Sequence, residues 1–158
     1  MPGCGVVEFH SGVLRGDSTL CGHFPLEPEA AEDVLGIADA WLLCPSFLQG
    51  GRYTIEDVHY VAEGRAFAPA TQTQFARDAS FGYKSSNLRD YVVEKSNGNI
   101  APEKATSLGL ETIRRGGTDA VLDQLLGVAK GTVVIVNAAA EEDVDLLILA
   151  FLKAAGRN

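Results

Sequence analysis

The chain has 158 residues, of which 46% are hydrophobic and 22% charged, and its formal net charge is −8. This length suits one domain with a buried core, and the composition is that of a globular protein. The acidic excess, with no basic cluster longer than Arg114-Arg115, argues against a nucleic-acid partner. No apolar run approaches the ~20 residues of a membrane span, and the first residues lack the pattern of a signal peptide, so we expect a cytoplasmic protein.

The amino-terminal part predicts one strand and one helix. The strand falls at either Val6–Phe9 or Val13–Leu14, on two apolar runs separated by His10-Ser11-Gly12. Pro25 and the acidic residues after it are typical of a helix start, and Gly36 predicts its end. The residues expected on the buried face of this helix are Ala30, Ala31, Val34 and Leu35.

Between that strand and helix lies a segment with the composition of a ligand-binding turn, Arg15 to Phe24. It combines a cation, a carboxylate, two hydroxyls and two glycines. An arginine can hold a carboxylate or phosphate through two parallel hydrogen bonds, and glycine allows backbone conformations closed to other residues. An ordinary capped turn would use the same residue types, so composition alone leaves both interpretations open.

The next residues predict a buried strand, a loop and a hairpin. The apolar run 40–44, ended by Pro45, is typical of a strand buried on both faces of a parallel sheet. The loop 46–54 contains Gly50-Gly51-Arg52 and would lie at a strand's carboxyl end, where α/β sheets bind ligands, although a plain connection explains it equally well. Residues 58–68 predict a β-hairpin turning at Gly64.

The second half of the chain alternates helices and strands. We expect an ordered loop over 71–84, a helix capped by Ser85 or Ser86 and ended at Asn97-Gly98, and a weak strand at 105–110. A helix follows from Thr118 to Gly131. The clearest strand of the chain is 132–136, and the last helix starts at Glu141, with its apolar residues at helical spacing: Val144, Leu147, Ile148, Phe151, Leu152 and Ala155. This order predicts an α/β fold, a mostly parallel sheet with helices on both faces and an inserted β-hairpin.

Motifs for several chemistries are absent from the sequence. It has no glycine-rich phosphate loop, no dinucleotide-binding fingerprint and no nucleophile elbow. The cysteines and histidines lack the spacing of metal ligands or of a disulfide framework, so we predict no metal site; they are Cys4, Cys21, Cys44, His10, His23 and His59.

Several stretches resemble, in order, the amino-terminal domain of the four-carbon acid sugar kinase family. They are Arg15-Gly16-Asp17-Ser18-Thr19-Leu20, Gly22-His23-Phe24-Pro25, 41–45, 47–54, 57–61, 75–78 and 82–88. The resemblance covers residues 13 to 155. The amino-acid sequence of these stretches is most similar to that of the domain of this family found within large plant fusion proteins, which also contain a class II ketose-bisphosphate aldolase.

The resemblance implies a function for particular residues. The family phosphorylates sugar acids such as threonate, erythronate or 3-oxo-tetronate with ATP and Mg²⁺, and its amino-terminal domain holds the sugar acid. Carried over by position, Arg15, Gly16, Asp17 and Ser18 are the substrate-binding residues. The neighbouring positions that would support them are Gly22, His23, Arg52 and Thr54.

The chain also departs from the family pattern. It lacks the family's opening Asp-Asp-x-Thr-Gly segment and its ATP-binding domain, and Cys21 replaces the expected arginine. We therefore expect a single partial domain, 1–158, that binds no nucleotide or metal by itself and whose catalytic residues are unknown. Two hypotheses follow: the sugar-acid-binding part of a kinase completed by an ATP-binding domain in cis or in trans, or a non-catalytic remnant or interaction module.

Overall fold

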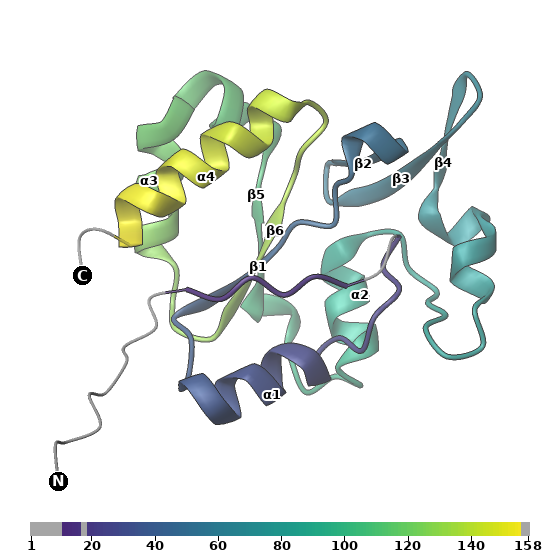
Figure 1. The fold of residues 1–158 in the computed structure, drawn as a ribbon, viewed down its shortest axis with the longest axis horizontal. Coiled ribbons are helices and arrows are strands. Elements are labelled where there is room, and N and C mark those ends of the chain that lie inside the picture. The colour runs from purple at the N-terminus through teal and green to yellow at the C-terminus, as the bar shows by residue number, and fades with distance from the viewer. Residues whose placement is uncertain (1–10, 17–18, 156–158) are drawn as a thin grey trace, which may run out of the picture.

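A computed structural model describes residues 11–16 and 19–155 (Figure 1). Two three-stranded sheets organise the fold. The parallel sheet has the order β1-β6-β5, from Ala40–Leu43, Thr132–Val136 and Ala105–Leu108. The antiparallel sheet has the order β2-β3-β4, from Arg52–Ile55, Val58–Glu63 and Ala66–Pro69. The predicted α/β fold with an inserted hairpin is confirmed.

Helices cover both faces of the parallel sheet (Figure 1). Helices α3 (Gly117–Gly127) and α4 (Glu141–Ala155) pack on one face, and α2 (Leu88–Lys95) on the other. The central strand β6 supplies both cores, because Val133 and Ile135 point to the α2 side while Val134 and Val136 point to the α3 and α4 side. Alternation along a strand places successive side chains on opposite faces, so an entirely apolar strand suits this position.

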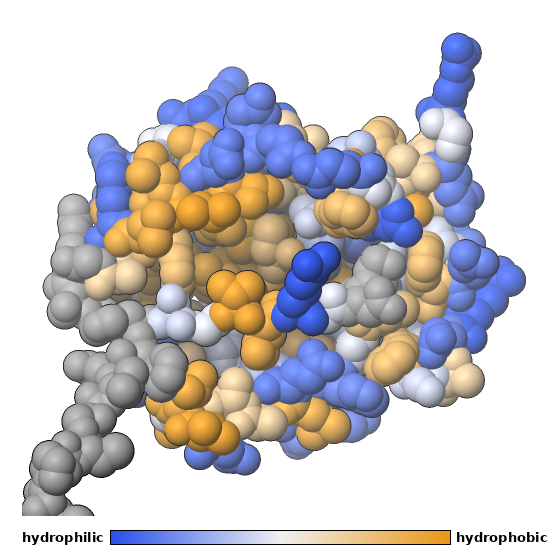
Figure 2. All heavy atoms as spheres, viewed as in Figure 1, coloured by the Kyte–Doolittle hydropathy of each residue, from blue (hydrophilic) through white to orange (hydrophobic). Residues whose placement is uncertain are grey.

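The edge strand β1 is less buried than its apolar sequence predicts. Its four residues are half-buried, since β6 is its only partner strand within the described residues. The helix α4 also exposes part of the face expected to be buried. Leu147 and Ala150 pack inward, but Ile148 and Leu152 are 49% and 61% exposed. Apolar atoms gather along α4 and around the hollow beside it in Figure 2.

The amino-terminal predictions are corrected in two places. The alternative strand at Val13–Leu14 is wrong, because residues 11–16 pair with no described strand and Val13 is 92% exposed. The alternative at Val6–Phe9 lies outside the described residues. Helix α1 (Leu26–Leu35) forms as expected, but none of its residues is buried. The chain is anchored just before it, where the Phe24 ring packs 6.0 Å from that of Trp41.

The predicted loop 46–54 is partly wrong, because its end forms strand β2. Arg52–Ile55 pairs with β3 through a two-residue turn, Glu56-Asp57, whose φ angles of 51° and 63° match a tight hairpin. Thr54 also exchanges two backbone hydrogen bonds with Ala138, at 2.9 and 3.0 Å. This bridge joins the hairpin sheet to the chain just after β6. The loop interpretation failed because no glycine marks the turn and no apolar period marks the strand.

Capping and helix limits also differ from the sequence prediction. Asn87, rather than either preceding serine, caps α2 by accepting from two backbone amides. Helix α3 begins at Gly117 without a side-chain cap and ends at Gly127, four residues early. A π-helical turn over Thr112–Gly116 precedes it, which the sequence pattern did not predict. The remaining short helical turns are Leu48–Gly50, Ala70–Gln72, Gln74–Arg77 and Pro102–Lys104.

The described residues contain neither a membrane-spanning helix nor a cluster of metal-ligating side chains. None of their helices has the length and apolar content that crossing a membrane requires. Among these same residues, no group of three or more histidine, cysteine, aspartate or glutamate side chains is arranged to hold a metal ion.

Candidate functional site

The segment with ligand-binding composition forms a closed turn with an unusual backbone. A Cβ atom placed on Gly16 would lie 3.4 Å from the Cys21 carbonyl oxygen, so the two ends of the turn approach closely. Thr19 and Leu20 are buried and have φ angles of 59° and 64°. Residues other than glycine rarely adopt such backbone angles, and β-branched residues adopt them least of all. The surrounding structure must hold this conformation in place.

Two tyrosine hydroxyls donate hydrogen bonds to backbone carbonyl oxygens of the turn. The Tyr83 hydroxyl donates to the Thr19 carbonyl oxygen at 3.2 Å, and the Tyr91 hydroxyl donates to the Leu20 carbonyl oxygen at 3.3 Å. Burial, with a contribution from Cys21, raises the pKa of Tyr83 to about 12, and burial also raises the pKa of Tyr91. Both phenols therefore remain protonated hydrogen-bond donors at neutral pH.

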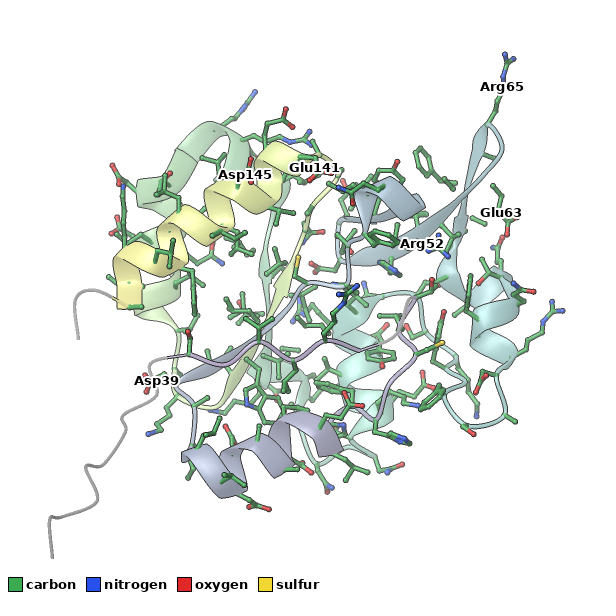
Figure 3. The ribbon with its side chains drawn as sticks, in the orientation of Figure 1. Asp39, Arg52, Glu63, Arg65, Glu141 and Asp145 are labelled. Atoms are coloured by element: carbon green, nitrogen blue, oxygen red, sulfur yellow. The ribbon has the colours of Figure 1, made fainter. Side chains whose placement is uncertain are left out.

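Arg52 contacts the same turn from the hairpin sheet. Its Nε atom donates to Thr19 Oγ1 at 3.0 Å, Nη1 donates to the Gly50 carbonyl oxygen, and the guanidinium lies 5.3 Å from the centre of the Phe75 ring. Figure 3 shows Arg52 at the hairpin sheet, Glu141 and Asp145 on α4, and Asp39 and Glu63 on opposite sides of the molecule. Within the described residues no carboxylate forms an ion pair with it. The turn is thus joined to a half-buried cation.

The substrate-binding residues that the resemblance implies are only partly visible. Arg15 and Gly16 are exposed on the approach to the turn. Asp17 and Ser18 lie outside the described residues. Cys21 is half-buried, with its Sγ atom 3.9 Å from the Thr19 carbonyl oxygen. Arg15 therefore lies four positions, and Gly16 three positions, before Thr19, the residue that Tyr83 and Arg52 hold in place.

Gly22 and His23 lie at a separate cavity. This cavity, of about 270 Å³, opens beside the start of α1, and its polar lining includes Lys95 and Asn97 as well as His23. The His23 imidazole packs edge-on against Phe81, 4.9 Å between ring centres. Lys95 donates to two backbone carbonyls, so its charge helps to fix the loop before α2.

Thr54 belongs to a buried hydrogen-bond cluster instead of facing the turn. Its Oγ1 atom lies 3.1 Å from His59 Nδ1 and accepts from Ser46 Oγ at 3.3 Å. His59 is fully buried, and its Nε2 atom is the one buried side-chain polar atom without a partner among the described residues. Burial, reinforced by the Arg52 charge, lowers the pKa of His59 to about 4. The imidazole is therefore neutral at pH 7.

Sequence reasoning singled out Arg52 but missed the two tyrosines. The sequence patterns assigned no role in the turn to Tyr83, in the loop expected over 71–84, or to Tyr91, in the helix expected after Ser85 or Ser86. Their contacts with the turn span 64 and 71 residues. The one available signal was a pair of tyrosines, rather than phenylalanines, at positions expected to be buried, because a buried phenol needs a hydrogen-bond partner.

Comparisons with known proteins place the chain in context. A family model described as a sugar-binding N-terminal domain matches residues 3–158. A crystal structure of a domain of unknown function (DUF1537) from Bordetella bronchiseptica, a domain-swapped dimer with bound citrate, is 26% identical, with a TM-score of 0.61 over 85% of this chain and 29% of that one. No curated protein matches the chain.

Two more distant structures share the fold. A DUF1537-family protein from Haemophilus influenzae is 13% identical, with a TM-score of 0.61 over 90% of this chain and 36% of its own. A Salmonella typhimurium LT2 protein, provisionally described as a tRNA synthase, is 11% identical, with a TM-score of 0.63 over 89% of this chain and 32% of its own. The chain thus spans about a third of the length of these solved structures.

Proposed function

The chain belongs to the family of sugar-binding N-terminal domains, and from this premise we propose that it binds a four-carbon sugar acid of the threonate, erythronate or 3-oxo-tetronate type. In this proposal it is the sugar-acid-binding part of an ATP-dependent kinase, and the nucleotide-binding part and Mg²⁺ belong to the rest of the full-length protein. The sequence resemblance to four-carbon acid sugar kinases supports the kinase assignment.

The observation that carries the proposal is the environment of Arg52. A net charge of −8 repels an anionic ligand at long range, so binding requires a local cation that the protein has not already neutralised. Arg52 is half-buried, has no ion-pair partner among the described residues, and donates through Nε to Thr19 of the turn. Its Nη2 atom makes no hydrogen bond to any described residue. A guanidinium in this state suits a carboxylate.

The relative from Bordetella bronchiseptica supports an anionic ligand, because citrate is bound in its crystal structure. In the proposed complex Arg52 and Arg15 attract the ligand carboxylate. Asp17 accepts hydrogen bonds from the sugar hydroxyls, and Ser18 donates to the same ligand. These roles of Arg15, Asp17 and Ser18 come from the family resemblance.

Calorimetric titration tests the proposal. The parent chain is titrated with threonate, erythronate and citrate, and we expect measurable binding of at least one of them. The variant Arg52→Gln should weaken that binding by about one to two decades, the usual effect of losing a charge-assisted hydrogen bond. Arg89→Gln is the matched control, because Arg89 is exposed on α2. The proposal would be contradicted if the parent bound none of the three acids, or if Arg52→Gln bound them as tightly as Arg89→Gln.

A second measurement addresses the kinase lineage. Phosphoryl transfer depends on cations placed around the phosphates, and the sequence has no glycine-rich loop to hold them. We expect no sugar-acid phosphate when the chain is incubated with ATP, Mg²⁺ and each sugar acid. Product above a protein-free blank, lost in Asp17→Ala, would show that the chain is itself a kinase. If the parent neither binds nor reacts, the alternative of a non-catalytic interaction module gains support.

A further inference from the structure

The backbone of the turn has an unusual feature at two consecutive positions. Thr19 and Leu20 both occupy the left-handed region, with φ angles of 59° and 64°. Neither is glycine, and Thr19 is β-branched, which makes its conformation a true outlier. A backbone of this kind relaxes to a commoner conformation unless its surroundings hold it in place.

The contacts that hold it come from distant parts of the chain. Tyr83 donates to the Thr19 carbonyl oxygen, and Tyr91, on α2, donates to the next carbonyl oxygen along the backbone. The two tyrosine rings pack edge to face, 5.9 Å between centres and 80° between planes. Both side chains are buried, with 4% and 2% exposure. Each phenol is therefore fixed by its neighbour and by the core.

Core packing alone does not account for the two hydroxyl groups. Phenylalanine would fill nearly the same volume without placing a polar atom in the core. Here both phenols meet consecutive carbonyls of a single turn, and Arg52 holds the Thr19 side chain from the other direction. The Tyr91 contact and the shorter of two Tyr83 contacts therefore reach the backbone of Thr19 and Leu20, while the Tyr83 hydroxyl also lies 3.5 Å from the Ala70 carbonyl oxygen.

We infer that Tyr83 and Tyr91 are positioning residues, whose hydroxyls hold Thr19 and Leu20 in the conformation that presents Arg15, Gly16 and Arg52 to the sugar acid. The inference rests on the proposed function. Holding the turn before the ligand arrives removes part of the ordering cost of binding, so the hydroxyls contribute to affinity without touching the ligand.

The test uses Tyr83→Phe and Tyr91→Phe, which remove only the two hydroxyls. With threonate, erythronate and citrate as probes, we expect each variant to bind about fivefold to tenfold more weakly than the parent, the usual effect of one lost hydrogen bond. Hydrogen exchange at the backbone amides of residues 19–22 should become faster in both variants. Tyr60→Phe is the matched control, because Tyr60 is half-buried and its hydroxyl makes no hydrogen bond to a described residue.

A purely structural role is separated by a second control. Arg114→Gln breaks the ion pair with Asp143, and neither residue forms a hydrogen bond with a described residue of the turn, so this variant should lower the melting temperature while leaving Kd unchanged. All titrations are performed at a temperature where every variant is fully folded. Tyrosine variants that melt lower but bind as tightly as the parent would overturn the inference and leave the proposed function intact. A parent that binds none of the three probes would overturn the proposed function and, with it, the assigned purpose of the two hydroxyls.

Discussion

The buried imidazole of His59 makes the stability of this protein depend on pH in a calculable way. His59 is fully buried on β3, beside Thr54 and near the Arg52 charge. Burial and that charge lower its pKa from 6.5 to about 4 in the folded state. The unfolded chain binds the proton at its ordinary pKa, so between pH 6.5 and 4 the unfolded state holds more protons. The free energy of unfolding therefore falls as pH falls through this range.

The size of this effect follows from the difference between the two pKa values. Each pKa unit corresponds to about 1.36 kcal/mol, so the His59 contribution decreases by about 3 kcal/mol between pH 7.5 and pH 4. Domains of this size have total stabilities of about 5–15 kcal/mol. The loss is thus large enough to measure by urea denaturation at a series of pH values.

The variant His59→Gln isolates this contribution. Glutamine is neutral throughout and keeps polar atoms near Thr54, so the parent should lose about 3 kcal/mol relative to the variant on going from pH 7.5 to 4. Carboxylates titrate in both proteins and cancel in the difference. His23→Gln is the control, because His23 is exposed. A stability difference between parent and His59→Gln that stays constant across this range would refute the reasoning.

Three other substitutions have expected outcomes. Cys21→Arg restores the guanidinium of the family pattern at a half-buried position and should tighten sugar-acid binding by about one to two decades, as measured by titration. Asp143→Asn should lower the free energy of unfolding by about 1.5–3 kcal/mol in urea, because the buried Asp143 carboxylate accepts two charge-assisted 2.8 Å hydrogen bonds from the half-exposed Arg114. Gly82→Ala should cost about 1–3 kcal/mol in the same assay, because its Cβ would lie 2.6 Å from the Asp78 carbonyl oxygen.

Each of these outcomes has a clear contradiction. If Cys21→Arg melts lower and binds no better, position 21 serves core packing. An Asp143→Asn variant as stable as the parent would mean that the desolvation cost of the buried Asp143 carboxylate offsets its pairing with Arg114. An unchanged Gly82→Ala variant would mean that the loop before Tyr83 can shift at no cost.

A strand was predictable from the sequence where its apolar residues match the faces that the fold buries. The run 132–136 is β-branched at every position and apolar from Val133 to Val136, and the structure places β6 at the centre of its sheet with both faces buried. Strand β2 was not predictable in the same way. Only Thr54 of its four residues is buried, and the backbone partner of Thr54 is Ala138, from a distant part of the chain.

The site was predictable by residue type but not by arrangement. The mixture of Arg15, Gly16, Asp17 and Ser18 marked a ligand-binding turn, and the arginine after Gly50-Gly51 marked a second cation. What local patterns could not give was the contact from Arg52 to Thr19, across 33 residues, or the two tyrosine hydroxyls. Helix α1 shows the same limit, since its apolar residues have helical spacing but none is buried.

The hairpin sheet is attached to the parallel sheet by contacts that close a long loop of chain. Besides the Thr54–Ala138 bridge, the Asp57 amide donates to Asn137 Oδ1 at 2.8 Å, and Asn137 Nδ2 donates to the Asp57 carboxylate at 2.8 Å, across 80 residues. During translation at about 5–20 residues per second, the hairpin leaves the ribosome on the order of ten seconds before its anchor is made. A nascent chain stalled before β6 lacks this anchor, so we expect it to bind a sugar acid more weakly than the full chain does.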